Sequence, residues 1–551
     1  KLYQYTQKSK KKSKRIGVLM RASAYIDSFA KDHLPDKATW PDFIFEKSLP
    51  TYGEQINAAT ELLRGAIRAG YAERPAIMMG DLIWSYNDLD KISNQIAAAL
   101  CDDYGLISGN RVLLRGNNTP MLAALWYGVL KAGGIAVTTM TMLRQKELDP
   151  IIEIAKIDII IIENNLSIDV FDSCIGKAKH ILSFGDNDCD IEKAILNKDG
   201  NFEAIKTSSD DVALLAFTSG TTGIPKATMQ FHRDILAMAD SFARHILKPE
   251  PTDIFCGSPP LAFTFGLGGL LVFPARFGSC VVYYAGGGAD VILDVVEKYK
   301  ITTLFTAPTA YKVMTDHVEG RDISSLKTCV SAGENLPLAV SDNFYEKSGI
   351  RLIDGIGATE MIHVFISASG DDVRPGSTGK VVPGYEAKIW GDDNKELPRE
   401  NAGRLVVRGP TGCRYLNGDR QSTYVIDGWN VTGDIFKQDQ DGYFWFVARG
   451  DDIIVTSGYN VGSPEVEQAI MAHDAVSECA VVGAADAQRG TIIKAFIVLK
   501  DGVEQSDQLI KEIQTFVKEN IAPYKYPRAI EFIDQLPKSP SGKLLRKDLK
   551  G

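Results

Sequence analysis

The chain has 551 residues, well beyond the roughly 250–300 residues at which a single hydrophobic core stops growing, so at least two compact units are expected. Its composition, 45% hydrophobic and 24% charged, is that of an ordinary globular protein and excludes a disordered chain. A net charge of −9 argues against a nucleic-acid-binding surface as the main function.

Cysteine usage and hydropathy exclude further classes. The eight cysteines stand singly, with no C-x-x-C pair and no His-rich partner segment, so neither a zinc ribbon nor a disulfide framework is predicted. No apolar run approaches the ~20 residues of a membrane span, and the most apolar run, IDIIIIE at Ile157–Glu163, has the length of a buried strand. We therefore expect no membrane span and a reducing, cytoplasmic setting.

The first 22 residues form a basic arm that we expect to be flexible. Six of the eight residues from Lys8 to Arg15 are basic (KSKKKSKR). Such a run is most often a solvated arm, and a lipid contact, a nucleic-acid contact or a targeting signal are the alternatives. The sequence begins at Lys1 rather than Met, which we interpret as truncation or processing.

From about Tyr71 onward, short apolar runs alternate with amphipathic stretches, a pattern typical of helices packed on buried, largely parallel strands. A helix is predicted at Pro120–Ala132, because a proline occupies its first turn and two glycines follow it. Strands are predicted at Val112–Leu114, Ile135–Thr138, Cys280–Tyr284, Thr303–Thr306, Thr328–Ser331 and Leu352–Ile353. Ligands of such sheets bind in the loops outside the carboxyl ends of the strands.

Beyond Arg449 the pattern changes to that of a small unit, with short strands at Ala480–Val482 and Ala495–Leu499 and a helix at Gln508–Asn520. The predicted fold is therefore α/β. It has a large N-terminal domain of layered, mostly parallel sheets with helices over residues 23–448. A small, mobile α+β C-terminal domain follows over residues 449–551.

The strongest chemical signal is Leu214–Thr228, LLAFTSGTTGIPKAT, in which an apolar strand leads into a loop of hydroxyls, glycines and one lysine. Glycine allows backbone N–H groups to converge on anionic oxygens, the hydroxyl groups add donors, and the lysine adds a positive charge. The loop is not a Walker A motif, because no GK[ST] stands at the required distance. We predict a phosphate-binding loop.

The string TSGTTGIPKA resembles the signature loop of the adenylate-forming superfamily, which comprises acyl-CoA synthetases, peptide-synthetase adenylation domains and luciferases. The family pattern ends PKG, whereas Ala227 stands here and keeps the bulk of the loop nearly the same. The resemblance implies catalytic roles for Thr218 and Lys226. It also implies nucleotide-binding roles for Ser219, Gly220, Thr221 and Thr222.

The string DGIGATE at Asp354–Glu360 resembles the second nucleotide motif of the family, in which Thr359 and Glu360 serve phosphate and Mg²⁺. A hard divalent ion that bridges phosphate oxygens favours a carboxylate at a strand end. Many members carry an aromatic residue against adenine where Ile356 stands, so we expect adenine to be held by apolar contacts and by Asp354. On its own, such a string is also typical of a strand-end turn with a surface glutamate.

Two further segments complete the implied nucleotide site. SAGENLP at Ser331–Pro337 resembles the family's adenine wall and includes Gly333 and Glu334, while Gly355 belongs to the motif just described. TGD at Thr432–Asp434 resembles the aspartate that binds the ribose. A carboxylate suits a vicinal diol because its two oxygens accept two hydrogen bonds.

The string ARGDDIIVTSGYNVGSPEVE at Ala448–Glu467 resembles the inter-domain hinge of the family. The resemblance implies that Arg449 reaches the ribose, that Asp451 is the pivot and that Gly458 leaves room for the pantetheine arm of coenzyme A. PKSPSGKLLR at Pro537–Arg546 resembles the C-terminal catalytic loop, with Lys543 on a Ser–Gly turn. A mobile lysine can offset the negative charge that develops when a carboxylate attacks phosphorus.

Longer strings resemble the benzoate-CoA and 2-aminobenzoate-CoA ligase branch, namely SAYIDSFAKDHLPDKATWPDF, FHRD, PPLAFTFGLGG and DGIGATEMIHVFIS. In that branch the implied acid pocket includes Thr264, Phe265, Gly357 and His363. Two other interpretations stay open at this point. The alternation around Thr264 is also that of a half-buried strand, and a lone histidine on an apolar stretch is often a core residue.

The implied function is that of an ATP-dependent ligase, with ATP, Mg²⁺ and coenzyme A, that converts a small aromatic acid to its acyl-adenylate and then to its CoA thioester. The alternatives are an enzyme that loads a carrier-protein thiol, a medium-chain acyl-CoA synthetase and a non-catalytic nucleotide-binding relative. We expect no nucleic-acid partner, and a homodimer is compatible with the sequence.

Overall fold

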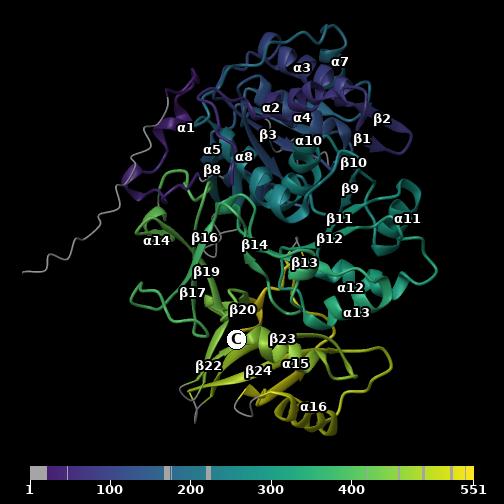
Figure 1. Cartoon of the computed structure of the whole chain (residues 1–551), viewed down its shortest axis with the longest axis vertical. Helices are drawn as coiled ribbons and strands as arrows, with labels where there is room; N and C mark the ends of the chain where they lie inside the picture. The colour runs from purple at the N-terminus through teal and green to yellow at the C-terminus, as the bar shows by residue number, and fades with distance from the viewer. Residues whose placement is uncertain are drawn as a thin grey trace, which may run out of the picture.

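The structure is a computed structural model, and it describes residues 22–45, 48–166, 174, 176–218, 225–418, 420–456, 459–486, 490–521, 525–539 and 542–550. Figure 1 shows a large upper body that contains two broad sheets and their helices, and a smaller unit with β22–β24, α15 and α16 at the bottom. None of the helices within these residues combines the length and the apolar character that a membrane span requires.

The first large sheet carries the phosphate-loop strands. Its strand order is β6-β5-β3-β4-β7-β8, and all neighbours are parallel except the antiparallel pair β7–β8. The strands are β3 (Arg111–Arg115), β4 (Ile135–Thr139), β5 (Ile159–Glu163), β6 (His180–Phe184), β7 (Val212–Thr218) and β8 (Lys226–Phe231). The predicted strands at Val112–Leu114 and Ile135–Thr138 are confirmed, and the apolar run ending at Glu163 forms the fully buried strand β5.

The second large sheet has nine strands in the order β15-β14-β13-β12-β11-β9-β10-β1-β2. Its centre is parallel and its two edges are antiparallel. The strands are β1 (Pro75–Met79), β2 (Leu82–Ser85), β9 (Ile254–Gly257), β10 (Cys280–Val282), β11 (Thr303–Thr306), β12 (Thr328–Ser331), β13 (Leu352–Gly357), β14 (Val364–Ser367) and β15 (Lys380–Val381).

Helices cover these sheets. They are α1 (Phe29–Asp32), α2 (Ala58–Ala66), α3 (Tyr86–Asp102), α4 (Pro120–Lys131), α5 (Gln145–Ala155), α7 (Asp190–Ile195), α8 (His232–Met238), α9 (Thr264–Leu267), α10 (Phe273–Phe277), α11 (Ala289–Tyr299), α12 (Pro308–His317) and α13 (Leu338–Ser348). Helix α4 confirms the predicted helix. Thr119 accepts a hydrogen bond from the backbone N–H of Leu122, and Pro120 needs no such partner in the first turn.

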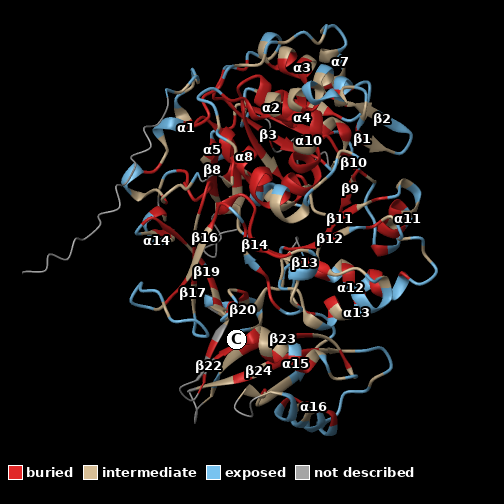
Figure 2. Cartoon of the chain, viewed as in Figure 1, coloured by how far each residue is buried: buried red, intermediate tan, exposed pale blue. Residues whose placement is uncertain are grey.

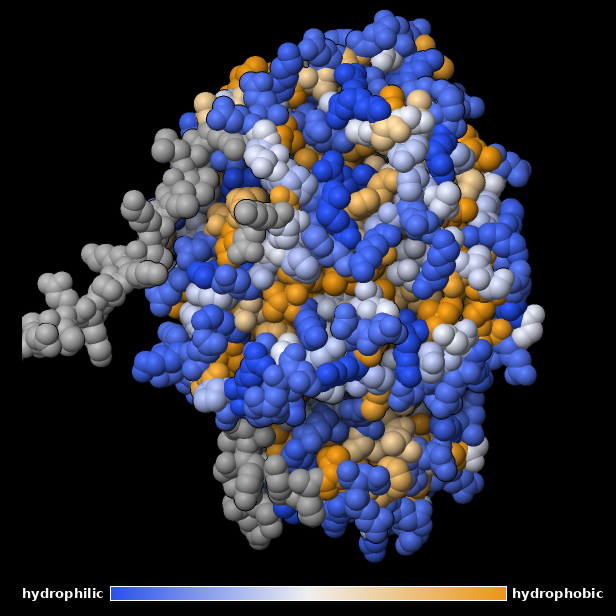
Figure 3. Space-filling view, viewed as in Figure 1, coloured by the Kyte–Doolittle hydropathy of each residue, from blue (hydrophilic) through white to orange (hydrophobic). Residues whose placement is uncertain are grey.

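The main core lies between the two sheets. Nearly every residue of α4 is buried, and Lys131 at its end is buried with its ammonium group 2.6 Å from Asp90. Figure 2 shows the buried residues in red gathered around α2, α4 and the neighbouring strands, whereas the outer faces of α3 and α16 are exposed. On the face in Figure 3 hydrophobic residues form separate groups among a mostly hydrophilic surface, as is usual for a globular protein.

A third sheet links the two large sheets to the C-terminal unit, and it is antiparallel, whereas the sequence predicted mostly parallel sheets. Its order is β16-β17-β19-β18, with β20 paired to β19. Its elements are β16 (Glu386–Trp390), β17 (Ala402–Arg408), α14 (Gln421–Tyr424), β18 (Val425–Ile426), β19 (Trp429–Gln438) and β20 (Phe444–Arg449).

The C-terminal unit has a core of its own, formed by buried residues of β21, β23, β24, α15 and α16. Its elements are β21 (Ile453–Thr456), β22 (Tyr459–Gly462), α15 (Ser463–Met471), β23 (Val476–Asp486), β24 (Gly490–Leu499), α16 (Asp507–Asn520) and β25 (Ala529–Phe532). The predicted strands at Ala480–Val482 and Ala495–Leu499 lie inside β23 and β24, and the predicted helix matches α16. The domain boundary at residue 449 stays a prediction, and a 3₁₀ turn, Gly450–Asp452, lies directly after it.

Candidate active site

The phosphate loop connects the ends of β7 and β8. Thr218 and Lys226 face each other in the register of this antiparallel pair, so the loop closes between them. Ser219, Gly220, Thr221 and Thr222 lie outside the described residues. Within the described part of the chain, the ammonium group of Lys226 makes no hydrogen bond or ion pair, and burial together with the positive charge of Arg420 lowers its pKa. An unpaired, partly desolvated cation at the end of a strand suits an anionic ligand.

The Thr–Glu motif is tied to the same loop by strand β8. Gln230 donates from Nε2 to the backbone oxygen of Thr359 at 3.0 Å, and the hydroxyl of Thr228 lies 3.4 Å from that oxygen. The hydroxyl of Tyr415 donates to Oε1 of Glu360 at 2.6 Å. The structure thus brings Thr359 and Glu360 to the exit of the phosphate loop, although more than 120 residues separate them from β8 in the sequence.

Two glycines let β13 approach β14 closely. A Cβ atom at Gly357 would lie 2.8 Å from the backbone of His363, and one at Gly355 would lie 2.9 Å from Val364. Real Cβ atoms do not approach so closely, so a larger residue would require a shift of the backbone at Gly357 and of the Val364 side chain at Gly355. These glycines therefore bring the motif against the segment that carries His363.

The predicted adenine side of the site lies at the carboxyl ends of β12 and β13. Asp354 and Ile356 alternate with buried residues of β13 and share one face of the strand. Burial raises the pKa of Asp354 to about 7, with the backbone N–H of Gly355 and the hydroxyl of Thr378 acting in the opposite direction. In the turn after β12, Gly333 has a φ of 92°, a backbone conformation that favours glycine. Burial raises the pKa of the neighbouring Glu334, and the positive charge of Lys543 opposes this shift.

The predicted ribose side lies on the third sheet. Asp434 of β19 pairs in register with Arg449 of β20, and Nη1 of Arg449 lies 3.2 Å from Oδ1 of Asp434. Burial raises the pKa of Asp434, and the Arg449 guanidinium opposes this most strongly. A carboxylate oriented by an arginine has oxygens that can accept hydrogen bonds from a diol.

Lys543 reaches this group from the C-terminal unit. It follows Gly542, whose φ is 83°, and its side chain remains accessible to solvent. The surrounding protein and Arg449 lower its pKa, whereas the carboxylates of Glu334, Asp434 and Glu360 raise it. In Figure 1 the yellow C-terminal segment extends upward toward β13. The structure therefore collects one lysine and three carboxylates from four distant segments.

Arg546 ties the segment of Lys543 to the predicted hinge. Its guanidinium group lies 2.7 Å from Glu467 of α15 and 3.1 Å from Asp452. The backbone of Asp451 belongs to the 3₁₀ turn beside Asp452, and Gly458 lies outside the described residues. The Lys543 segment and the hinge turn are thus held in one body by a partly buried arginine–carboxylate group.

The residues around Glu360 fit a metal ion that is also bound by oxygen atoms of the substrate. No group of three or more His, Cys, Asp and Glu side chains that could hold an ion occurs where the structure describes the chain. Glu360 offers one carboxylate, of which Tyr415 occupies one oxygen. Mg²⁺ ordinarily takes one or two carboxylates and completes its shell with phosphate oxygens and water. Glu360 beside the phosphate loop matches this donor set.

The predicted acid pocket is a cluster of aromatic rings. The ring of Phe265, on α9, lies 5.4 Å from Phe305 and 5.9 Å from His363. The ring of His363 also lies 4.7 Å from Phe273 and 5.4 Å from Phe242. The alternative of a strand around Thr264 is wrong, because Thr264–Leu267 is helical. The helix places Thr264 and Phe265 on successive positions of one turn.

His363 is an uncharged member of this cluster. It is 3% exposed, and burial lowers its pKa to about 3, which the backbone of Phe265 only partly opposes. Neither ring nitrogen makes a hydrogen bond of ordinary geometry to the described residues. Both ring nitrogens are buried within the protein, so the position fits a core histidine as well as a wall of the predicted acid pocket.

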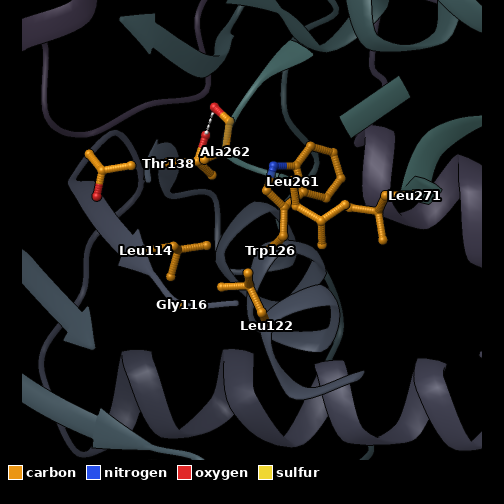
Figure 4. Close-up of a pocket in the computed structure, with 9 residues that line it drawn as sticks. Leu114, Gly116, Leu122, Trp126, Thr138, Leu261, Ala262 and Leu271 are labelled. Atoms are coloured by element: carbon orange, nitrogen blue, oxygen red, sulfur yellow. Dashed lines mark hydrogen bonds between the residues drawn. The ribbon is translucent and has the colours of Figure 1, made fainter. Parts of the chain in front are cut away.

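A narrow cavity borders Leu261 and Ala262, in the segment that leads into α9 (Figure 4). Its lining comes from Leu114, Gly116, Leu122, Trp126, Thr138, Thr139, Leu261, Ala262 and Leu271. The space open to the centre of a water molecule is about 10 Å³. The indole N–H of Trp126 and the hydroxyl of Thr139 have no hydrogen-bond partner among the described residues. The cavity is about the size of one water molecule.

The sequence matches two family patterns. The family described as AMP-binding enzyme matches residues 66–415, and its C-terminal domain, AMP-binding enzyme C-terminal domain, matches residues 465–543. The chain belongs to the AMP-binding enzyme family. The predicted membership of the adenylate-forming superfamily and the predicted similarity to its benzoate and 2-aminobenzoate branch are confirmed.

Three similar proteins show which activities occur among the relatives of this AMP-binding enzyme. Benzoate–CoA ligase of Thauera aromatica is 32% identical, over 90% of this chain and 95% of the relative. Human mitochondrial acyl-coenzyme A synthetase ACSM3 is also 32% identical, over 85% of this chain and 83% of the relative. The crystal structure of the anthranilate CoA ligase AuaEII in complex with anthranoyl-AMP superposes with a TM-score of 0.85 at 32% identity, over 90% of this chain and 97% of that one.

Sequence reasoning missed several residues of the AMP-binding enzyme's site, among them Thr228, Gln230, Tyr415 and Arg420. Thr228 and Gln230 are fully buried polar residues on alternate positions of an apolar strand. That pattern was visible in the sequence and indicates polar groups that need partners. Nothing local in the sequence indicated Tyr415 or Arg420. The pairing of segment 413–416 with β8 brings Tyr415 to the site, and the positive charge of Arg420 acts on Lys226.

Proposed function

We propose that the chain is an ATP-dependent ligase that converts a small aromatic carboxylic acid, of the benzoate or 2-aminobenzoate type, to its acyl-adenylate and then to the aryl-CoA thioester. The observation that carries the proposal is that Lys543 lies within electrostatic range of Glu334, Asp434 and Glu360, while Gln230 of β8 holds the backbone of the Thr–Glu motif. The activities named for the similar proteins, benzoate–CoA and anthranilate CoA ligase, support the reaction class.

In the first half-reaction a carboxylate oxygen of the acid attacks the α-phosphorus of ATP. The bond from the α-phosphorus to the bridging oxygen breaks, and pyrophosphate leaves with that oxygen. Lys226 and the loop donors bind the departing phosphates, and Lys543 offsets the negative charge on the attacking and α-phosphate oxygens. Mg²⁺, when bound at Glu360, supplies further neutralisation of the phosphate charge. Asp434 and Arg449 hold the ribose.

In the second half-reaction the thiolate of coenzyme A attacks the carbonyl carbon of the mixed anhydride. The carbon–oxygen bond to AMP breaks, and AMP leaves. For the thiol to reach the anhydride, the C-terminal unit rotates about Asp451, which withdraws Lys543 and brings Gly458 to the site. The Arg546 contacts support this motion, because they make the Lys543 segment move with α15 as one body.

The aromatic nature of the acid rests on the ring cluster around Phe265. An aromatic substrate gains about 0.5–1.5 kcal/mol per ring contact beyond the burial of area. The hydroxyl of Thr264 at the start of α9 is a polar group that can form a hydrogen bond with a ring substituent such as an amino group. An aliphatic acid would bury its chain here but would gain no ring contact.

A medium-chain acyl-CoA synthetase is the second candidate, because the similar human protein is an acyl-coenzyme A synthetase. Loading of a carrier-protein thiol and a non-catalytic nucleotide-binding role are further alternatives. The last is disfavoured because Lys226, Glu360, Asp434, Arg449 and Lys543 are all present. A homodimer, a cytoplasmic location and the absence of a nucleic-acid partner stay predictions.

The test is pyrophosphate release across benzoate, aminobenzoates, hydroxybenzoates, phenylacetate and medium-chain fatty acids, each with and without coenzyme A. We expect the highest kcat/KM with a benzoate or 2-aminobenzoate and formation of the CoA thioester. A preference for fatty acids would reject the aromatic assignment. Pyrophosphate release without transfer to coenzyme A would favour a carrier-protein acceptor, and no release with any acid would favour the non-catalytic alternative.

A further inference from the structure

Tyr415 lies on a short segment that pairs with the strand leaving the phosphate loop. The backbone N–H of Met229 donates to Arg414 at 2.8 Å, and that of Leu416 donates to Ala227 at 2.9 Å. Tyr415 itself forms an antiparallel bridge with Thr228. The segment therefore follows β8 at the point where β8 also holds the backbone of Thr359 through Gln230.

The backbone of Tyr415 is fixed from a second side as well. Its N–H donates to Oε1 of Gln421 at 2.9 Å, and the amide of Gln421 donates to the oxygen of Cys413 at 2.9 Å. The neighbouring Arg414 is completely buried and paired with the completely buried Asp234, and its Nε donates to Met229 at 3.0 Å. With both neighbours anchored, the direction of the Tyr415 side chain is set before any ligand binds.

The Tyr415 hydroxyl contacts one oxygen of the Glu360 carboxylate. The distance to Oε1, 2.6 Å, is that of a hydrogen bond to an ionised acceptor. Tyr415 is 6% exposed, so little water competes for this bond. No other hydrogen bond to the Glu360 carboxylate occurs among the described residues, so Oε2 has no protein partner there, and Gln230 of β8 lies 3.4 Å from the backbone oxygen of Glu360.

We propose that Tyr415 is the positioning residue that holds the Glu360 carboxylate with Oε1 occupied and Oε2 directed to the divalent cation and phosphates of ATP. The proposal rests on the metal-binding role of Glu360 in the proposed function. A hydrogen bond to a ligating carboxylate fixes its orientation, and loss of such an outer partner typically weakens metal affinity by about 10–100-fold.

The chain offers a matched control in Tyr424. Its ring packs edge-on against that of Tyr415, with the centroids 5.7 Å apart. Its hydroxyl is buried and has no hydrogen-bond partner among the described residues. Tyr415→Phe and Tyr424→Phe therefore remove the same atom from the same cluster, and only the first removes a contact to Glu360.

The experiment measures Mn²⁺ binding by electron paramagnetic resonance, with the full chain and a non-hydrolysable ATP analogue. We expect Tyr415→Phe to weaken Mn²⁺ affinity by about 10–100-fold. We expect Tyr424→Phe to bind like the unsubstituted protein, and analogue binding in excess chelator to be the same in all three. In a Glu360→Gln background, Tyr415→Phe is expected to add no further loss, because the hydroxyl acts through the carboxylate.

Unchanged Mn²⁺ affinity in Tyr415→Phe would overturn the proposal, and so would an equal loss in Tyr424→Phe, which would indicate a packing role. Because an analogue replaces ATP, these outcomes do not depend on which acid is activated. If the unsubstituted protein binds no Mn²⁺ with the analogue, the role of Glu360 in the proposed function fails and the inference fails with it. If that protein binds Mn²⁺ and Tyr415→Phe binds it equally well, the inference alone fails.

Discussion

At the scale of single residues, Lys543 gives the sharpest separation of the two half-reactions. In this orientation of the C-terminal unit, the Lys543 ammonium group interacts electrostatically with the carboxylates of Glu334, Asp434 and Glu360. In the proposed function it has no role once the acyl-adenylate has formed. Lys543→Ala is expected to slow acyl-adenylate formation by about 10²–10³-fold, the usual effect of removing one stabilising group from a transition state. Thioester formation from supplied acyl-adenylate is expected to stay near its original rate.

The measurement is pyrophosphate release for the first step and chromatography of the CoA thioester for the second. Lys547→Ala is the matched control, because Lys547 is an exposed lysine four positions away. Equal loss of both steps in Lys543→Ala would contradict the assigned role, and so would an equal effect of the control.

At the scale of elements, the N-terminal segment is attached to the start of α8 through His232. The N–H of Ala58 donates to Nδ1 of His232 at 3.1 Å, so the proton of the neutral ring is on Nε2, which lies 3.2 Å from the Tyr25 hydroxyl. That hydroxyl donates in turn to Val212 at 2.8 Å. Burial lowers the pKa of His232 to about 3. A second proton on the ring would face the N–H of Ala58.

This arrangement predicts loss of stability in acid. The unfolded chain binds a proton at His232 near pH 6.5, whereas the folded chain does not until about pH 3. The free energy of unfolding is therefore expected to fall as the pH falls from about 6.5 toward 3, since the unfolded state binds more protons. Urea unfolding at several pH values measures this slope, and His232→Gln should flatten it. His363→Gln is a comparison, because the pKa of His363 is similarly lowered and this variant should also flatten the slope. A slope that is unchanged in His232→Gln would contradict the assignment to His232.

Elements were predictable where local chemistry decides them. Fully apolar runs such as β5, and the proline and glycines that bound α4, indicate a strand and a helix without tertiary information. The segment at Thr264–Leu267 was ambiguous, because alternation over three residues is too short to separate a strand from a turn of helix. The antiparallel third sheet was not foreseen, because the direction of pairing depends on how connections cross the whole domain.

The same distinction between local sequence signals and tertiary assembly applies to the candidate site. Residues such as Lys226, Glu360 and Asp434 could be assigned as candidates because each stands in a recognisable string. The Tyr415–Glu360 hydrogen bond joins residues 55 apart, and the Gln230–Thr359 bond joins residues 129 apart. No local sequence pattern links residues so far apart along the chain, so these contacts form only when β8, β13 and segment 413–416 come together in the fold.

At the scale of the whole molecule, the proposed function assigns one orientation of the C-terminal unit to each half-reaction. Here the unit places Lys543 beside the nucleotide carboxylates. A direct contact between the large body and this unit is the ammonium group of Lys312, on α12, which donates to the backbone oxygen of Ser477 on β23 at 3.0 Å. This exposed bond favours the observed orientation, and the rotation in the proposed function would require it to break.

Lys312→Ala is therefore expected to shift the balance between the two orientations. An exposed hydrogen bond contributes at the lower end of about 0.5–1.5 kcal/mol, so acyl-adenylate formation should slow by about two- to threefold. Thioester formation from supplied acyl-adenylate should be unchanged or slightly faster, because the rotated orientation becomes easier to reach. Lys300→Ala is the control, because Lys300 pairs with Asp322 within the large body at 2.6 Å. Stopped-flow measurement of both half-reactions tests whether the Lys312 contact acts on the orientation of the C-terminal unit. Slowing of both steps, or an equal effect of Lys300→Ala, would show that the contact acts on general stability instead.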